Sequence, residues 1–276
     1  MASRAERAMS FGAIADDYDR LRPGPPQEAV DWLLPGHCQV AVDVGAGTGL
    51  LTRALARKVP RVVAVEPDER MRAVLRARSP GVEVTEGRGE SIPLPDASAD
   101  GVFVSSAWHW MDPKLAVPEI ARVLRDGGRF GVIWTSRDRE VGWLRELSRQ
   151  RDVSRPREQV TAGHDDRAGP RAGGHAVTLP AGAPLGNVAT EAFRFTRTMT
   201  IDGLVDLHGT YSGVITASPE EREAGLARAR AALEQRFPDA REIAVPMRAW
   251  CWRAARARRH LPGNRKGTGH RAGPLP

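Results

Sequence analysis

The sequence predicts an α/β fold with a seven-stranded, mostly parallel sheet, helices on both faces and an antiparallel C-terminal strand pair. Three observations predict it. Between residues 40 and 134, short apolar runs alternate with amphipathic helical patterns, as in parallel strands joined by crossover helices. The first run passes through a glycine-rich turn directly into a helix. Near the C-terminus, strand patterns at 192–200 and 243–252 enclose two helical patterns and suit a closing antiparallel pair.

Length and charge limit the possible classes. A chain of 276 residues suits one α/β domain with a lid or insertion. It shows no apolar run of membrane-spanning length and no signal-peptide core, so we expect a cytoplasmic protein without a membrane partner. Seven of the 41 Lys and Arg residues lie in residues 253–276, and the other 34 balance the 34 acidic residues. The net charge of +7 is therefore a property of the tail, and nucleic acid is not the expected partner.

Residues 1–34 precede the first strand. They contain two short helical patterns separated by Pro23, Pro25 and Pro26, and we expect a helical cap.

The glycine-rich turn lies within residues 40–55, VAVDVGAGTGLLTRAL. Glycines occupy every second position, at Gly45, Gly47 and Gly49, which lets a ligand approach the backbone and permits positive φ. A dinucleotide site would need a third glycine where Leu50 stands, and a phosphate-binding P-loop would need Lys-Ser/Thr after the glycines. The turn therefore indicates an adenosine ligand without a pyrophosphate, and it disfavours a nicotinamide-dependent oxidoreductase.

Glu66 ends the second apolar run, residues 61–67. A carboxylate that leaves a strand beside a glycine-rich loop can accept hydrogen bonds from both hydroxyls of a ribose. A helix is predicted at 68–78, a short third strand at 82–85 and a loop at 87–96.

The fourth strand, residues 100–107, delivers Trp108, His109 and Trp110 to the carboxyl end of the sheet, where ligands bind in open α/β sheets. If this segment is extended, the two tryptophans share one side and His109 takes the other. A helix at 114–124, begun by Asp112 and Pro113 and ended by glycines 127 and 128, leads to the fifth strand at 129–134.

The C-terminal half is less regular. A helix is predicted at 141–147, but the interval 137–190 is a poorly patterned, polar lid or insertion, and a reading-frame error in a GC-rich gene would produce similar composition. Residues 191–253 complete the α/β domain, with helices at 201–211 and 219–237, the second capped by Ser218. Residues 254–276 form a basic tail that we expect to be disordered.

Five ordered segments carry a family resemblance: DVGAGTG, AVEPDERM, GRGESIPLPDASAD, AWHWMD and EIARVLRDGGRFGVIW. The chain resembles the class I S-adenosylmethionine-dependent methyltransferases, in particular a small-molecule branch with an AWHW-type segment after the fourth strand. The resemblance implies a Rossmann-like fold, S-adenosylmethionine as cofactor and S-adenosylhomocysteine as product. The cofactor-binding residues that it implies, together with those argued above, are Tyr18, Asp43, Gly45, Ala46, Gly47, Thr48, Gly49, Glu66, Pro67, Met71, Gly89, Glu90, Ser91 and Ser105.

The resemblance also places an acceptor pocket at the same edge of the sheet. Trp108, Trp110, His208 and Tyr211 are its candidate substrate-binding residues, and Arg22 is placed where a guanidinium can reach the methionine end. Several of these have a structural alternative: Tyr18, Met71 and the tryptophans can pack in the core, and Glu90 can be a solvated loop acid.

Methyl transfer from a sulfonium is an in-line displacement, so the protein contributes chiefly by positioning the acceptor. A hydroxyl or ammonium acceptor also needs a base, and His109 is the candidate catalytic residue, with acceptor positioning or packing as alternatives. No metal site is expected, because the nearest pair, His109 and Asp112, offers too few ligands. Cys38 and Cys251 are expected to be ordinary thiols.

The expected function is methyl transfer from S-adenosylmethionine to a small-molecule acceptor. Two alternatives stay open: a non-catalytic protein that binds the cofactor, and an RNA or protein methyltransferase that uses the basic tail. The absence of an Asn-Pro-Pro-Tyr segment after the fourth strand counts against nucleobase amino methylation. The sequence makes no prediction of oligomeric state.

Overall fold

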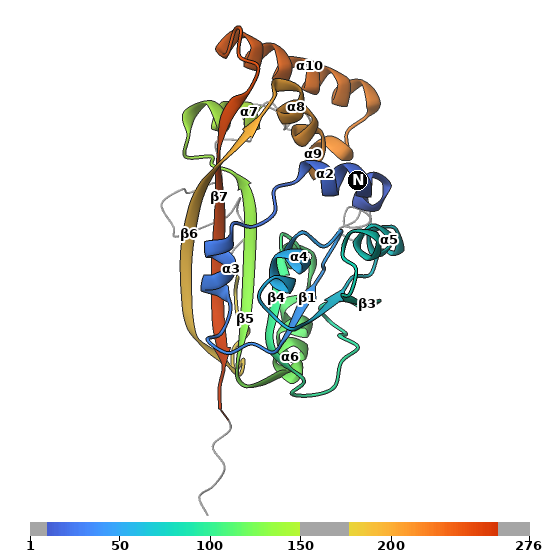
Figure 1. Cartoon of the computed structure of the whole chain (residues 1–276), viewed down its shortest axis with the longest axis vertical. Helices are drawn as coiled ribbons and strands as arrows, with labels where there is room; N and C mark the ends of the chain where they lie inside the picture. The colour runs from blue at the N-terminus through green and yellow to red at the C-terminus, as the bar shows by residue number, and fades with distance from the viewer. Residues whose placement is uncertain (1–9, 150–176, 259–276) are drawn as a thin grey trace, which may run out of the picture.

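The computed structural model describes residues 10–149 and 177–258. Their strands form one seven-stranded sheet in the order β3-β2-β1-β4-β5-β7-β6 (Figure 1). The strands are β1 (Val40–Val44), β2 (Arg61–Val65), β3 (Glu83–Thr85), β4 (Ala99–Ser105), β5 (Leu124–Arg137), β6 (Leu185–Met199) and β7 (Ile243–Arg256). Strands β1 to β5 are parallel, and β7 pairs antiparallel with both β5 and β6. The predicted fold class is confirmed.

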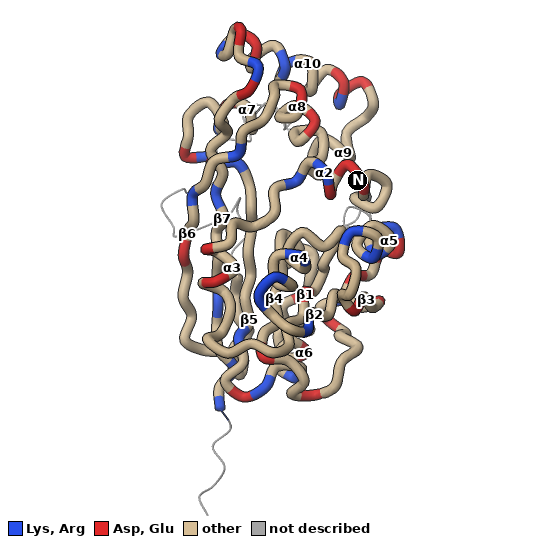
Figure 2. The backbone as a smooth tube through the Cα atoms, viewed as in Figure 1, with Lys and Arg blue, Asp and Glu red and all other residues tan. Residues whose placement is uncertain are grey.

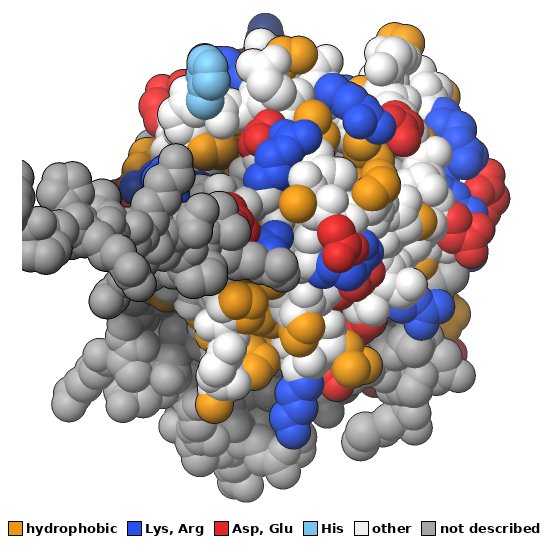
Figure 3. All heavy atoms as spheres, turned by 90° about the horizontal axis from the view of Figure 1, so that it is seen from below, with side chains coloured by type: hydrophobic (Ala, Val, Ile, Leu, Met, Phe, Trp, Pro, Cys, Tyr) orange, Lys and Arg blue, Asp and Glu red, His pale blue; other side chains and the backbone are white. Residues whose placement is uncertain are grey.

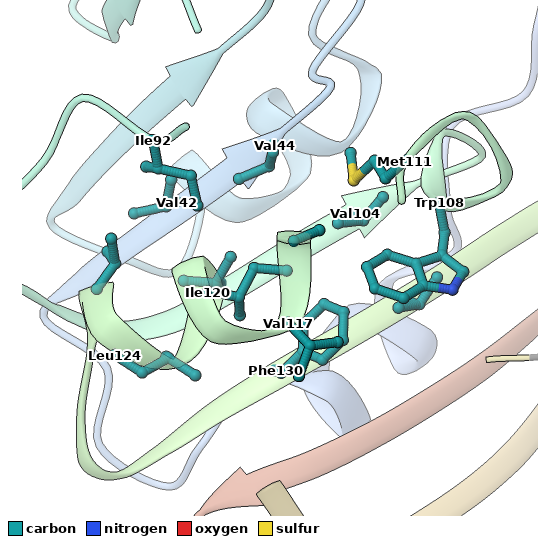
Figure 4. Packing of buried hydrophobic residues seen from close by; sticks show 14 of the residues in the cluster. Val42, Val44, Ile92, Val104, Trp108, Met111, Val117, Ile120, Leu124 and Phe130 are labelled. Carbon is teal, nitrogen blue, oxygen red and sulfur yellow. The ribbon is translucent and has the colours of Figure 1, made fainter. Parts of the chain in front are cut away.

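Helices cover both faces of the parallel part of the sheet. On one face, α3 (Gln27–Leu33) and α4 (Leu50–Ala56) pack against Ala41, Val62 and Phe103. On the other face, α6 (Pro113–Val123) packs against Val102, Val104 and Phe130 (Figure 4). Strands buried on both faces need apolar side chains at successive positions, which explains the continuous apolar runs in the sequence.

A second group of helices lies beyond the carboxyl end of β5, beside the end of β6 and the start of β7 (Figure 1). It consists of α7 (Gly142–Arg149), α8 (Ile201–Gly209), α9 (Ser212–Ile215) and α10 (Pro219–Arg236). Apolar side chains of α7, α8 and α10 share one cluster with the ends of β6 and β7, represented by Leu144, Leu204, Leu233 and Met247. Ser218 caps α10 as predicted, in a reciprocal capping box with Glu221.

The N-terminal segment, η1 (Ser10–Ile14) and α2 (Ala15–Leu21), joins these two parts. It contacts α5 (Glu69–Arg78) on the sheet side and α8 and α9 on the other. Of the two helical patterns in the predicted cap, residues 1–34, the first is this segment, whereas the second is α3, which packs on the sheet.

Several predicted boundaries are wrong. Helix α6 ends at Val123, because Leu124 is already extended and pairs with Ala99 of β4, so Gly127 and Gly128 belong to β5 instead of ending the helix. Strand β6 begins at Leu185, inside the interval predicted as a lid, and β7 continues to Arg256, inside the predicted tail. Residues 150–176 of the predicted lid and residues 259–276 of the predicted tail lie outside the described residues.

Basic and acidic side chains are interspersed along the described chain, for example on α5 and α10 (Figure 2). The lower end of the molecule likewise shows small apolar patches between charges of both signs (Figure 3). Among the described helices, none is long and apolar enough to cross a membrane.

Candidate functional site

A cavity of about 740 Å³ opens at the carboxyl edge of the sheet. It runs from the loops after β1 and β2, past the end of β4, to the end of β5 and the start of α9. The N-terminal segment closes one side. Predicted site residues found in its wall are Tyr18, Gly45, Gly47, Glu66, Pro67, Met71, Gly89, Glu90, Ser105, His109, Trp110 and Tyr211.

The glycine-rich turn forms the floor of the cavity below the cap. Gly45 and Gly47 have φ of +67° and +56°, a backbone conformation that residues with a Cβ rarely adopt. A Cβ on Gly45 would lie 2.8 Å from the Cβ of Ala107, whereas one on Gly47 would meet nothing within 4 Å. Gly45 therefore allows the turn to pack closely against the segment after β4. Gly47 has no side chain, which leaves space for a ligand in the cavity.

Glu66 fixes this turn. Its Oε2 accepts a hydrogen bond from the backbone N–H of Gly47 at 2.9 Å, and its Oε1 accepts one from Asp68 N–H at 3.0 Å. The side chain is only 7% exposed, and burial raises the pKa of the carboxyl above its usual value. Each carboxylate oxygen keeps one lone pair for a second donor, so the group can accept two further hydrogen bonds from a diol.

The wall next to Glu66 suits a flat apolar ring. Pro67 and Met71 contribute apolar surface, and Gly89 lies against Met111, whose Sδ would be 2.4 Å from a Cβ at position 89. Glu90 is tied to this wall because its Oε1 accepts a hydrogen bond from Asp112 N–H at 2.7 Å. The arrangement is compatible with the adenine position that the resemblance implies.

Five predicted cofactor residues lie outside the cavity wall: Asp43, Ala46, Thr48, Gly49 and Ser91. Gly45 and Gly47 of the turn line the cavity. Ala46 and Thr48 point away from the cavity and are buried. Gly49 is the N-cap of α4, which begins at Leu50, and it packs against Leu75 and Ser79 of the α5 region. Ala46, Thr48 and Gly49 thus shape the turn, whereas Ser91 is exposed in the loop after β3, where it pairs with Arg88.

Asp43 lies beneath the turn and is fully buried. Its Oδ2 accepts a hydrogen bond from the Thr52 hydroxyl at 2.6 Å, which ties β1 to α4. Burial is the largest cause that raises the pKa of Asp43 from 3.8 to about 7, and the nearby Glu66 raises it further. The carboxyl is thus a structural group that changes its protonation near neutral pH.

The segment after β4 is not extended, which corrects the conditional prediction for its three aromatic residues. Ser106 has a φ of +53° and turns the chain into a short 3-10 helix, η2 (Trp108–Trp110). His109 and Trp110 face the cavity, whereas Trp108 is 3% exposed and packs on Phe130 with ring centroids 5.3 Å apart (Figure 4). Trp108 is a core residue instead of a pocket residue.

Aromatic contacts hold the N-terminal segment over the cavity. The ring of Phe11 lies 5.7 Å from that of Tyr18 and 6.3 Å from that of Trp110, both in edge-to-face geometry. The cap is therefore packed directly on the rim that carries His109.

The far wall was missed in the sequence analysis. Trp134, Thr135, Ser136 and Arg137 line the cavity from the end of β5. The rule that ligands bind at the carboxyl ends of parallel strands applies to β5 as well as to β4, so the signal was present.

Tyr211 lies in this wall as predicted, but His208 does not. His208 is 1% exposed and lies behind Arg137, whose Nη2 is 3.2 Å from His208 Nδ1. Because an arginine can only donate, Nδ1 is the acceptor and the imidazole is neutral. His208 therefore lies behind the cavity wall, in contact with Arg137 and with the ring of Tyr211, whose centroid is 6.4 Å away.

No group of three or more His, Cys, Asp or Glu residues that could hold a metal occurs in the described ranges.

The chain resembles known methyltransferases in sequence and in fold. A family model described as "Methyltransferase domain" matches residues 42–132. The chain is 39% identical over 257 residues to an uncharacterized methyltransferase of Mycobacterium tuberculosis H37Rv, covering 92% of this chain and 99% of that protein. It is 30% identical over 219 residues to an uncharacterized methyltransferase-like protein of Schizosaccharomyces pombe, covering 78% and 82%. A solved structure from Anaeromyxobacter dehalogenans that is assigned as a type II methyltransferase aligns with a TM-score of 0.58 at 25% identity, over 85% of this chain and 97% of that one.

Proposed function

Because the chain belongs to the class I S-adenosylmethionine-dependent methyltransferases, we propose that it transfers a methyl group from S-adenosylmethionine to a small-molecule acceptor inside the cavity described above. The observation that carries the proposal is that one cavity joins the glycine-rich turn and Glu66 to a second wall of aromatic and basic residues. Both reactants of a methyl transfer must meet within bonding distance, and a shared cavity provides this.

The cofactor fits the first half of the cavity. Gly47 leaves the backbone open to a ligand, and Glu66 has acceptor capacity for both ribose hydroxyls. Pro67, Met71, Gly89 and Glu90 then surround the adenine, while Tyr18 and Ser105 lie toward the methionine end. When bound, the cofactor supplies an electrophilic methyl group on a sulfonium, so that little further activation is needed.

The acceptor takes the second half of the cavity. Trp110 and Tyr211 offer apolar surface there, and His109 lies on the rim between the two halves of the wall. His109 would accept the proton of a hydroxyl or ammonium acceptor as the new bond forms, or would orient an acceptor that carries no such proton.

The covered cavity favours a small acceptor over a macromolecule. Its volume of about 740 Å³ lies in the range of small-molecule sites, and the packed N-terminal segment forms one side of it. Basic and acidic residues are interspersed along the described chain (Figure 2), whereas nucleic-acid-binding proteins gather basic residues on one face.

A label-transfer experiment tests the proposal. The protein is incubated with S-adenosylmethionine carrying a labelled methyl group, first with the metabolite pool and then with the RNA and protein fraction of a lysate of the source organism. We expect label in the metabolite pool with the wild type and none with Gly47→Val, whose side chain would occupy the cofactor space. Label confined to RNA or protein would contradict a small acceptor, and folded protein that binds the cofactor but transfers no label would support the non-catalytic alternative.

A further inference from the structure

Arg137 is a buried cation in the acceptor wall of the cavity. It is the last residue of β5 and only 2% exposed. Its Nη2 lies 3.2 Å from His208 Nδ1, and its Cζ lies 5.0 Å from the ring centroid of Tyr211. Its Nη1 has no hydrogen-bond partner, and in the part of the chain that the structure describes no carboxylate forms an ion pair with Arg137.

Among the described residues, no carboxylate compensates this charge. Burial, the largest cause, lowers the pKa of the guanidinium, and the nearby Arg139 and Arg22 lower it further, whereas Tyr211 opposes them. His208 is neutral, as argued above. Asp138, the adjacent acid, binds Arg194 through Oδ2 at 3.1 Å and lies outside the cavity wall. A buried charge without a counter-ion is costly, so this wall is suited to an anionic ligand.

Arg22 approaches the same ring from the N-terminal segment. Its Cζ lies 4.1 Å from the ring centroid of Tyr211, and its Nη2 donates to the carbonyl oxygen of Thr210 at 2.9 Å. Two guanidinium groups thus flank Tyr211, but the cofactor brings a single carboxylate. Arg22 is the residue expected to bind the carboxylate at the methionine end of the cofactor. Arg137 is therefore available to bind an anionic group of the other reactant, the methyl acceptor.

We propose that Arg137 binds a carboxylate of the methyl acceptor, so that the substrates of this enzyme are small organic acids with an apolar or aromatic body. This inference rests on the proposed function. The planar fork of a guanidinium matches the two oxygens of a carboxylate, and a single carboxylate balances a single buried charge. Trp134 and Trp110, in the same cavity wall, provide the apolar surface for the rest of such a molecule.

The first arm of the test asks whether Arg137 serves the cofactor. S-adenosylhomocysteine carries a carboxylate, and 5′-methylthioadenosine is the matching ligand without it. We expect Arg22→Gln to weaken S-adenosylhomocysteine binding by roughly 10-fold or more while 5′-methylthioadenosine binding stays unchanged, and Arg137→Gln to leave both affinities unchanged. Selective loss of S-adenosylhomocysteine affinity in Arg137→Gln would overturn the proposal, because Arg137 would then bind the cofactor's own carboxylate.

The second arm asks which ligand Arg137 prefers. Protein saturated with S-adenosylhomocysteine is titrated, by ligand-observed NMR, with phenylacetate and hexanoate, with their neutral amides and with phenyl phosphate. We expect each acid to bind the wild type roughly 10-fold or more tightly than its amide, and Arg137→Gln to abolish this preference. The matched control is Arg139→Gln, an exposed arginine of the same cavity wall, which should retain the preference.

The outcomes are separable. Wild type that binds S-adenosylhomocysteine but prefers neither acid over its amide would overturn the proposal, as would tighter binding of phenyl phosphate than of phenylacetate. Wild type that fails to bind S-adenosylhomocysteine would remove the proposed function itself. If Arg137→Gln does not fold, Arg137→Lys keeps the charge and loses the fork, and it should reduce the preference without abolishing it.

Discussion

Removing the Glu66 carboxylate should weaken cofactor binding far more than it weakens the fold. In Glu66→Ala, two ribose hydroxyls lose a charged acceptor, and the turn loses the bond from Gly47 N–H that holds it in place. A hydrogen bond to a charged group contributes about 1.5–3 kcal/mol, so the loss of two corresponds to at least about 3 kcal/mol. That energy is roughly a 100-fold increase in the dissociation constant.

The assay is calorimetric titration with S-adenosylhomocysteine, beside a thermal melt that verifies folding. Glu66→Gln keeps the size of the side chain and one carbonyl oxygen, so it should fall between wild type and Glu66→Ala. The matched control is Glu69→Gln on α5, an exposed acid that pairs with Arg72 and Arg76 outside the cavity wall, for which we expect a change of at most about threefold. Folded Glu66→Ala that binds within about threefold of wild type would refute the assignment of Glu66 to the ribose.

Three further predictions concern the rim, the buried acid and the core. His109→Asn should lower kcat by about 100-fold or more if the acceptor must lose a proton, with S-adenosylhomocysteine affinity unchanged, and a rise in KM alone would indicate positioning instead. Since the pKa of Asp43 is raised to about 7, the folded state holds this proton more tightly than the unfolded state. The contribution of Asp43 to the free energy of unfolding should therefore fall as pH rises from about 4 to about 7, by on the order of 4 kcal/mol, and level off above. Urea titrations of wild type and Asp43→Asn measure this term, and parallel pH profiles would contradict it. Gly131→Ala places a Cβ 2.8 Å from the Phe103 ring and should destabilise the protein by about 1–3 kcal/mol in the same assay, whereas an unchanged midpoint would show that the core can yield.

The fold was largely predictable because its signals are local or periodic. Parallel strands buried on both faces must be apolar throughout, and each helix between them has its own start and stop residues, such as Asp112 before α6. The helix and strand ends that were predicted wrongly depend on pairing between segments that are distant in the sequence. Leu124 leaves the helical conformation where it pairs with Ala99, and the additional residues of β6 and β7 are supported by their partner strands.

The site was predictable where chemistry constrains single positions. Gly45, Gly47 and Glu66 come together because a tight turn and a carboxylate at adjacent strand ends need those residue types. The failures have a different cause. Trp108 was misplaced because the positive φ of Ser106 determines which way the next residues point, and no periodicity signals one left-handed residue.

Arg137 does not belong to any sequence motif that would have identified it. Its proposed role rests on its burial without a carboxylate partner among the described residues, which is a property of the packed fold. Sequence reasoning identified the glycine-rich turn, Glu66 and part of the opposite wall, including Tyr211, whereas the residues at the end of β5 were found only in the structure.

A crystal structure of the protein with bound S-adenosylhomocysteine tests the central claim most directly. We predict both ribose hydroxyls within hydrogen-bond distance of the Glu66 carboxylate, the adenine beside Met71, and the sulfur facing the half of the cavity that ends at Arg137. A ligand bound outside this cavity, or one whose ribose makes no contact with Glu66, would contradict the account.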